Sequence, residues 1–144
     1  MNDAPEVVVI TGASTGVGRA TMRKFAKHGA RIGLIARGVD GLKAAQKEVE
    51  ELGGKALVFP VDIGNADRVE AAAAQIEADL GEIDIWINNA MASVFSPIKE
   101  MTPEEFRRVT EVTFLGCVYG DELRLFSFYK ADVAAPFQAR DLYF

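Results

Sequence analysis

Short apolar runs alternate with longer amphipathic stretches over the first 90 residues of the chain. Four apolar runs, at 7–10, 31–36, 55–61 and 83–87, have the length and β-branched content of buried strands. Each of the first three precedes a segment whose apolar residues recur every three or four positions, which predicts a helix. Because such an alternation needs right-handed crossovers, we predict a doubly wound parallel α/β sheet with four strands in the order 3-2-1-4.

Glycines and capping residues mark where the predicted helices end and begin. Gly29, Gly53 and Gly81 each follow a helical pattern and are typical of C-terminal helix caps. The segment 102–105, Thr-Pro-Glu-Glu, has an N-cap hydroxyl, a proline suited to the first helical position and a capping-box glutamate. It predicts that a further helix begins there. Pro60 lacks a backbone donor, which favours an edge position for the third strand.

The turn between the first strand and the first helix, residues 11–18, is a candidate ligand site. Gly12 is suited to a sharp turn, Gly16 to close approach of the backbone to a pyrophosphate, and Gly18 to tight packing of the helix on the sheet. Free N–H groups and the positive dipole end of the helix would stabilise the phosphates. The spacing Gly-x-x-x-Gly-x-Gly, without a following Gly-Lys-Ser/Thr, argues against an NTP-binding P-loop. A tight turn with a purely structural role is the alternative.

The run Thr11-Gly12-Ala13-Ser14-Thr15-Gly16-Val17-Gly18 resembles the cofactor motif of the short-chain dehydrogenase/reductase family. Asn88-Asn89-Ala90 resembles that family's Asn-Asn-Ala-Gly, with Met91 in place of the glycine, and Val61-Asp62-Ile63 resembles its adenine-binding segment. The resemblance covers about residues 6–120. It implies a Rossmann-like fold and hydride transfer between a nicotinamide and a small carbonyl or alcohol substrate.

Arg37, at the end of the second predicted strand, bears on the choice of cofactor. It lies 19 residues after Gly18, about where dinucleotide-binding folds place an acid for the adenosine ribose or an arginine for a 2′-phosphate. Because the arginine fork suits phosphate, NADP is favoured over NAD, although Asp40 keeps NAD open. With Arg37, the residues that the resemblance implies for cofactor binding are Gly12, Ser14, Thr15, Gly16, Val17, Gly18, Asp62, Ile63, Asn89 and Ala90.

The catalytic residues of the family are not matched in this sequence. The segment 112–116 resembles the family segment that carries asparagine where Thr113 stands, and that asparagine supports a catalytic lysine through water. The family serine and the proton-donating Tyr-x-x-x-Lys pair are also expected beyond it. The three tyrosines are Tyr119, Tyr129 and Tyr143, and none is followed by a lysine four positions later. We therefore expect impaired chemistry, with the catalytic residues unknown.

Composition and charge exclude several classes of protein. With a formal net charge of −5 and no basic run, the chain has no electrostatic footprint for nucleic acid or an anionic membrane. The polar start is unlike a signal peptide, and no apolar stretch approaches the roughly 20 residues that span a bilayer, so a cytoplasmic location is expected. One cysteine, Cys117, and one histidine, His28, exclude an internal disulfide and a zinc site between them.

Residues 121–144 differ from the preceding residues, because aromatic side chains crowd there without a clear period. We expect an incomplete NADP-binding Rossmann-like domain at 1–120 and a divergent tail at 121–144. The tail is interpreted as unrelated sequence of the kind that a shifted reading frame would give, and a genuine lineage-specific ending is the alternative. An incomplete sheet leaves the fourth strand and the helix from Thr102 partly bare, so self-association is expected.

Two other functional classes stay open at this point. A receiver-type signalling domain would use Asp62 as a phosphate acceptor, but it needs an acidic pair after the first strand, where Thr11 and Gly12 stand. A non-catalytic fragment would bind a dinucleotide, a partner or a second copy through the surface around Phe114 and the aromatic tail.

Overall fold

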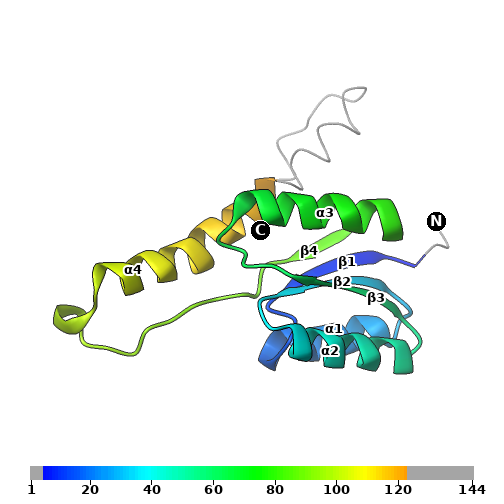
Figure 1. The fold of residues 1–144 in the computed structure, drawn as a ribbon. Coiled ribbons are helices and arrows are strands. Elements are labelled where there is room, and N and C mark those ends of the chain that lie inside the picture. Colours follow the sequence, from blue (N-terminus) through cyan, green and yellow to red (C-terminus); the bar gives the residue numbers. More distant parts are fainter. Residues whose placement is uncertain (1–4, 123–144) are drawn as a thin grey trace, which may run out of the picture.

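The computed structural model describes residues 5–122 and contains one four-stranded parallel sheet (Figure 1). The strands are β1 (Val7–Thr11), β2 (Arg31–Ala36), β3 (Lys55–Pro60) and β4 (Ile85–Ile87). Their order is β3-β2-β1-β4, which confirms the predicted topology. β1 is central and pairs with both β2 and β4, whereas β3 lies at an edge, as Pro60 indicated.

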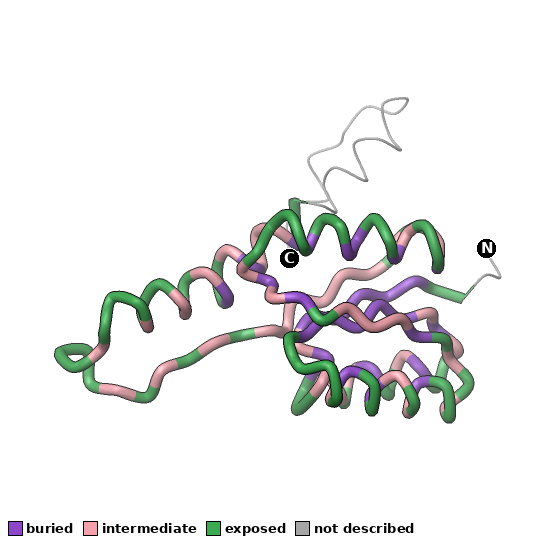
Figure 2. Tube along the Cα trace, viewed as in Figure 1, coloured by how far each residue is buried: buried purple, intermediate pink, exposed green. Residues whose placement is uncertain are grey.

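Helices cover both faces of the sheet. α1 (Gly16–Ala26) and α2 (Val39–Glu51) lie on one face, and α3 (Ala66–Leu80) lies on the other (Figure 1). β1 is buried on both sides, since alternate residues of a strand point to opposite faces. Val8 and Ile10 pack in the cluster with α1 and α2, and Val7 and Val9 pack in the cluster with α3. Figure 2 shows this concentration of buried residues on the strands and the inner sides of the helices.

β4 is shorter than the predicted strand at 83–87, because Asp84 takes over the first pairing position. The Asp84 carboxylate accepts the N–H of Val7 at 2.7 Å, while the backbone N–H of Asp84 donates to the Val7 carbonyl at 3.0 Å. A side-chain oxygen thus satisfies a strand donor that a ladder carbonyl would otherwise satisfy. Regular pairing of β4 with β1 begins one residue later, at Ile85.

After β4 the chain leaves the sheet as a loop and returns as a helical segment (Figure 1). We call the loop 91–102 and the helical segment 103–122 together the arm. The short 3₁₀ turn η1 (Ile98–Glu100) precedes α4 (Pro103–Val109), whose start has the predicted capping box. Thr102 Oγ1 accepts the Glu105 N–H at 3.2 Å, and the Glu105 carboxylate accepts the Thr102 N–H at 2.8 Å. The helix continues as a π-helical segment, η2 (Thr110–Leu115), which the sequence pattern did not indicate.

Two glycines let the end of this helical segment pack closely on the turn after β3 and on β4. A Cβ on Gly116 would come 2.5 Å from Ile63 Cδ1, and one on Gly120 would come 2.8 Å from an indole carbon of Trp86. The helical backbone extends to Glu122, where the described residues end. No helix within residues 5–122 has the length and apolar character needed to cross a membrane.

Candidate functional site

The buried hydroxyl of Thr11 joins the carboxyl ends of β1 and β4. Its Oγ1 donates to the Ile87 carbonyl at 3.3 Å and accepts the N–H groups of Asn89 and Ala90 at 3.0 and 3.1 Å. In return, the Asn89 side-chain amide donates to the carbonyls of Thr11 and Gly12 at 3.0 and 3.2 Å. Thr11 is fully buried, so no solvent competes for these bonds. The glycine turn and the Asn-Asn-Ala segment therefore form one structural unit.

This unit lies where the direction of the chain across the sheet reverses. From β1 the chain crosses through α1 to β2 on one side, and it later reaches β4 on the other side through α3 (Figure 1). In open parallel sheets, the connections on either side of such a point leave a crevice outside the carboxyl ends of the strands, and ligands bind there. The predicted cofactor segments are thus at the position in the fold where a ligand is expected.

The three glycines of the turn have different structural roles. Gly12 and Gly16 have positive φ values of 67° and 54°, which other residues adopt only with strain. A Cβ on Gly12 would lie 2.8 Å from the Asn89 side-chain nitrogen, and a Cβ on Gly18 would overlap the carbonyl oxygen of Gly12. By contrast, a Cβ on Gly16 would meet nothing within 4 Å. The open space is therefore at Gly16, while Gly12 and Gly18 are packed within the protein.

The start of α1 beside Gly16 fits an anionic ligand. The N-cap is Thr15, whose side chain makes no capping hydrogen bond, and the first turn carries no acidic side chain. Thr15, Gly16 and Val17 are exposed, and Ser14 is half-buried. Uncapped N–H groups and the positive dipole end of an 11-residue helix can hold a phosphate group without any change to the backbone.

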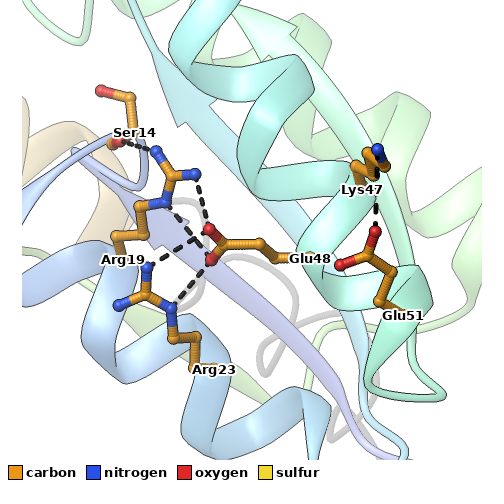
Figure 3. A network of polar contacts seen from close by, with 6 residues as sticks. All are labelled: Ser14, Arg19, Arg23, Lys47, Glu48 and Glu51. Atoms are coloured by element: carbon orange, nitrogen blue, oxygen red, sulfur yellow. Dashed lines mark hydrogen bonds and ion pairs between the residues drawn. The ribbon is translucent and has the colours of Figure 1, made fainter.

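An ion-pair network holds the outer side of this turn (Figure 3). Arg19 donates to the Ser14 carbonyl at 3.2 Å and pairs with Glu48 of α2 at 2.7 Å, and Arg23 pairs with the same carboxylate at 2.8 Å. Hydrogen bonds from Arg19 and then Arg23 lower the pKa of Glu48 to about 2. A Cβ on Gly41 of α2 would lie 2.9 Å from the Ser14 Cβ, so α2 also packs closely on the turn. The pattern analysis did not identify this network, because nothing in the local sequence pairs Arg19 with Glu48.

Arg37 and Asp62 follow the adjacent strands β2 and β3. Arg37 is exposed and makes no hydrogen bond or ion pair with any residue in the range that the structure describes. The Asp62 carboxylate accepts the Gly64 N–H at 3.0 Å and pairs with Arg108 of α4 at 2.7 Å. Burial raises the pKa of Asp62, but Arg108, the Gly64 N–H and the charge of Arg37 together lower it below its ordinary value. Ile63 is buried, so only its backbone is available to a ligand.

Thr113, at the position of the family asparagine, lies in the π-helical segment η2. Its hydroxyl donates to the Ala92 carbonyl and accepts the Ala92 N–H, both at 3.0 Å. This pair of bonds fixes the loop after the Asn-Asn-Ala segment to the helix. Met91, in that loop, has a negative φ, so the turn is built without the left-handed conformation that the family glycine suggested.

The structure describes only one of the three tyrosines, none of which is followed by the family lysine. Tyr119 is half-buried on the helix after η2. Tyr129 and Tyr143, with most of the predicted tail, lie outside the described residues. Within the described part of the chain, no group of three or more His, Cys, Asp or Glu residues could hold a metal ion.

Comparisons with known proteins point to one family. The family model described as short chain dehydrogenase matches residues 6–132. Uncharacterized oxidoreductase YxnA of Bacillus subtilis is 36% identical over 115 residues, covering 80% of this chain and 32% of the relative. The chain therefore spans about a third of the length of this curated relative.

Solved structures of the same family match the fold. The L-sorbose reductase of Gluconobacter frateurii, complexed with NADPH and L-sorbose, has a TM-score of 0.77 and 33% identity, with 83% of this chain and 46% of that chain covered. A metagenomic short-chain oxidoreductase in complex with NADP has a TM-score of 0.83 and 32% identity, with coverages of 89% and 58%.

Substituting Glu48→Gln should lower stability in a pH-dependent way. Because the folded-state pKa of Glu48 is lowered to about 2, its ion pairs contribute fully above the ordinary carboxylate range and are lost as the pH falls from about 4.5 towards 2. For a partly exposed pair we expect a loss of at most about 1 kcal/mol at pH 7. Urea unfolding at several pH values measures it.

Glu51→Gln is the matched control, since Glu51 makes a more exposed contact with Lys47 at 3.8 Å (Figure 3). The control should change stability less than Glu48→Gln at pH 7. A difference between the parent and Glu48→Gln that persists unchanged at pH 2 would contradict the assigned role of the network.

Proposed function

The chain belongs to the short-chain dehydrogenase family, and we propose that it binds a nicotinamide dinucleotide in the crevice between β1 and β4, with NADP favoured over NAD. The observation that carries the proposal is the open space at Gly16 beside the uncapped start of α1. The proposed contact residues are Gly12, Ser14, Thr15, Gly16, Val17, Gly18, Arg37, Asp62, Ile63, Asn89 and Ala90.

Each part of this site would have a distinct role. The N–H groups at the start of α1 would bind the pyrophosphate, and the rigid unit of Thr11 and Asn89 would form the floor beneath it. Asp62 would accept a hydrogen bond from the adenine amino group, next to a backbone contact at Ile63. Arg37, whose side chain makes no hydrogen bond or ion pair within residues 5–122, would bind the 2′-phosphate. The bound cofactor would supply the hydride acceptor or donor.

Similar proteins support a nicotinamide dinucleotide as the cofactor. The L-sorbose reductase and the metagenomic oxidoreductase are described with NADPH and with NADP, respectively. For this chain, the case for NADP rests on Arg37 and on the absence of an acid at the end of β2, where Ala36 and Arg37 stand. A receiver-type role has no comparable support, because Thr11 and Gly12 stand where the acidic pair would be needed.

We further propose that these 144 residues bind the cofactor without sustaining turnover. The reaction would be hydride exchange with a small carbonyl or alcohol, but the sequence holds no Tyr-x-x-x-Lys pair. In the described conformation the hydroxyl proton of Thr113 is donated to the Ala92 carbonyl, so it is not available to a relay unless that bond breaks. The division into an incomplete domain at 1–120 and a divergent tail at 121–144 remains part of this proposal. The family match itself extends to residue 132.

We also propose that the chain associates with itself. The arm exposes large apolar side chains, which is costly for an isolated monomer. They are Met91, Phe95, Ile98, Phe106 and Phe114, each at least 64% exposed. In the described part of the chain, the outer edge of β4 has no paired strand. A second copy could cover both surfaces.

Arg37→Ala should weaken NADP(H) binding selectively. Losing a charge-assisted hydrogen bond to phosphate costs about 1.5–3 kcal/mol, so we expect an increase of about 10- to 150-fold in the Kd for NADP(H) and little change for NAD(H). Calorimetric titration of both cofactors into the parent, Arg37→Ala and the control Arg107→Ala measures this. Equal affinity of the parent for both cofactors would refute the preference, and no binding of either would refute the site.

The parent chain should not reduce carbonyl compounds at an enzymatic rate. A positioned general acid contributes typically 10²- to 10⁴-fold, and no such pair is present in the sequence. The assay follows NADPH absorbance with aldehydes, ketones and quinones, and Gly16→Asp, which places a carboxylate at the proposed pyrophosphate site, is the control. Turnover of about 1 s⁻¹ or more that disappears in the control would overturn the prediction. It would mean that the chain supplies a proton donor other than a Tyr-x-x-x-Lys pair.

The double substitution Phe106→Ser and Phe114→Ser should reduce self-association, because it removes exposed apolar area from the arm. We expect the weight-average mass in sedimentation velocity to rise with concentration for the parent and to stay closer to that of the monomer for the variant. Val39→Ser, an exposed apolar position on α2, is the control and should behave as the parent. A parent that remains monomeric at every concentration would exclude the proposal.

A further inference from the structure

The carboxylate of Asp62 is held from two sides but keeps room for another donor. Oδ1 accepts the Gly64 N–H at 3.0 Å, and Oδ2 accepts from Arg108 Nη2 at 2.7 Å. The side chains of Asp62 and Arg108 are 35% and 33% exposed. Each carboxylate oxygen has two acceptor sites, so one on each oxygen is not used by these contacts. A ligand group that donates a hydrogen bond can therefore be received without breaking the ion pair.

Arg108 reaches Asp62 from a different part of the fold. It belongs to α4, whereas Asp62 lies in the turn between β3 and α3. Arg108 Nη1 lies 3.5 Å from the position that a Cβ on Gly64 would take, so the guanidinium lies over the Gly64 turn. Further along the same helical segment, Gly116 packs directly against Ile63. The helical segment thus contacts the turn at two places, and the ion pair is not an isolated surface contact.

We propose that Arg108 is a positioning residue for adenine recognition, holding the Asp62 carboxylate in the one orientation from which it accepts the adenine amino group. This inference rests on the proposed dinucleotide-binding function and deepens it. A free aspartate side chain in a turn samples several rotamers, and fixing one before binding removes that cost from the binding free energy. Arg108 has this effect without touching the cofactor itself.

The electrostatic surroundings of Asp62 support the same role. Burial disfavours the charged carboxylate, but the hydrogen bonds from Arg108 and Gly64 and the charges of Arg108 and Arg37 outweigh it, so the pKa of Asp62 is lowered. The carboxylate therefore stays a pure acceptor at neutral pH, as hydrogen bonding to an amino group requires. Two cations flank it, and only Arg108 makes direct contact.

The test compares NADPH with its deamino analogue, in which hypoxanthine replaces adenine and a carbonyl oxygen replaces the amino group. For the parent we expect the analogue to bind about tenfold or more weakly, because the carboxylate then loses a donor. In Arg108→Gln this ratio of dissociation constants should fall at least threefold, mainly through weaker NADPH binding. Arg108→Lys, which keeps the charge but not the fork, should give an intermediate ratio.

Arg107→Gln is the matched control, because Arg107 is the exposed neighbour on the same helix and should leave the parent ratio unchanged. A merely structural effect of Arg108 would weaken both ligands equally and leave the ratio unchanged, which would overturn the inference. A parent ratio near one would also overturn it, while the dinucleotide-binding function would stand. Absence of NADPH binding to the parent would instead refute the proposed function. If Arg108→Gln does not fold, the ratio for Arg108→Lys decides, and a value equal to that of the parent overturns the inference.

Discussion

One buried hydroxyl, that of Thr11, connects the two halves of the candidate site. It makes three hydrogen bonds across the boundary between β1 and β4, and the Asn89 side chain makes two more in the opposite direction. β4 has only three residues in regular pairing, so its position depends on these contacts at one end and on the Asp84 carboxylate at the other. An unsatisfied buried polar group costs about 1–3 kcal/mol, which gives this arrangement a strong preference for one geometry.

The glycine turn is therefore preorganised by contacts within the protein. The Asn89 side chain packs so closely on Gly12 and Gly18 that a Cβ on either glycine would clash with it. Arg19, which pairs with Glu48, also donates a hydrogen bond to the Ser14 carbonyl of the turn. The open space lies beside Gly16, at a helix start that has no side-chain cap. A phosphate group bound there, as proposed, would need little reorganisation of the turn, which would reduce the entropic cost of binding.

The arm has a different character from the sheet and its covering helices. Many of its large apolar side chains are exposed, although Val112 is buried in the cluster on the α3 face of the sheet. The other contacts of the arm named above are polar or involve glycines. Arg108 pairs with Asp62, and Thr113 pairs with the backbone of Ala92. The chain spans about a third of a curated relative and about half of each solved structure described above. Cofactor binding by these residues would therefore not by itself imply turnover.

The sequence by itself determined the sheet order, the capping box of α4 and the family. These features depend on periodicity, on glycine and proline positions and on short motifs, all of which act over a few neighbouring residues. Only the tertiary structure showed that Arg108 holds Asp62, that Glu48 joins Arg19 and Arg23, and that Asp84 shortens β4. Such contacts join segments distant in the sequence, so they depend on how the helices and strands pack. The π-helical segment η2 around Thr113 likewise had no local signal in the sequence. The capping box of α4 determines where the helix begins, but it says nothing about the type of helix that follows.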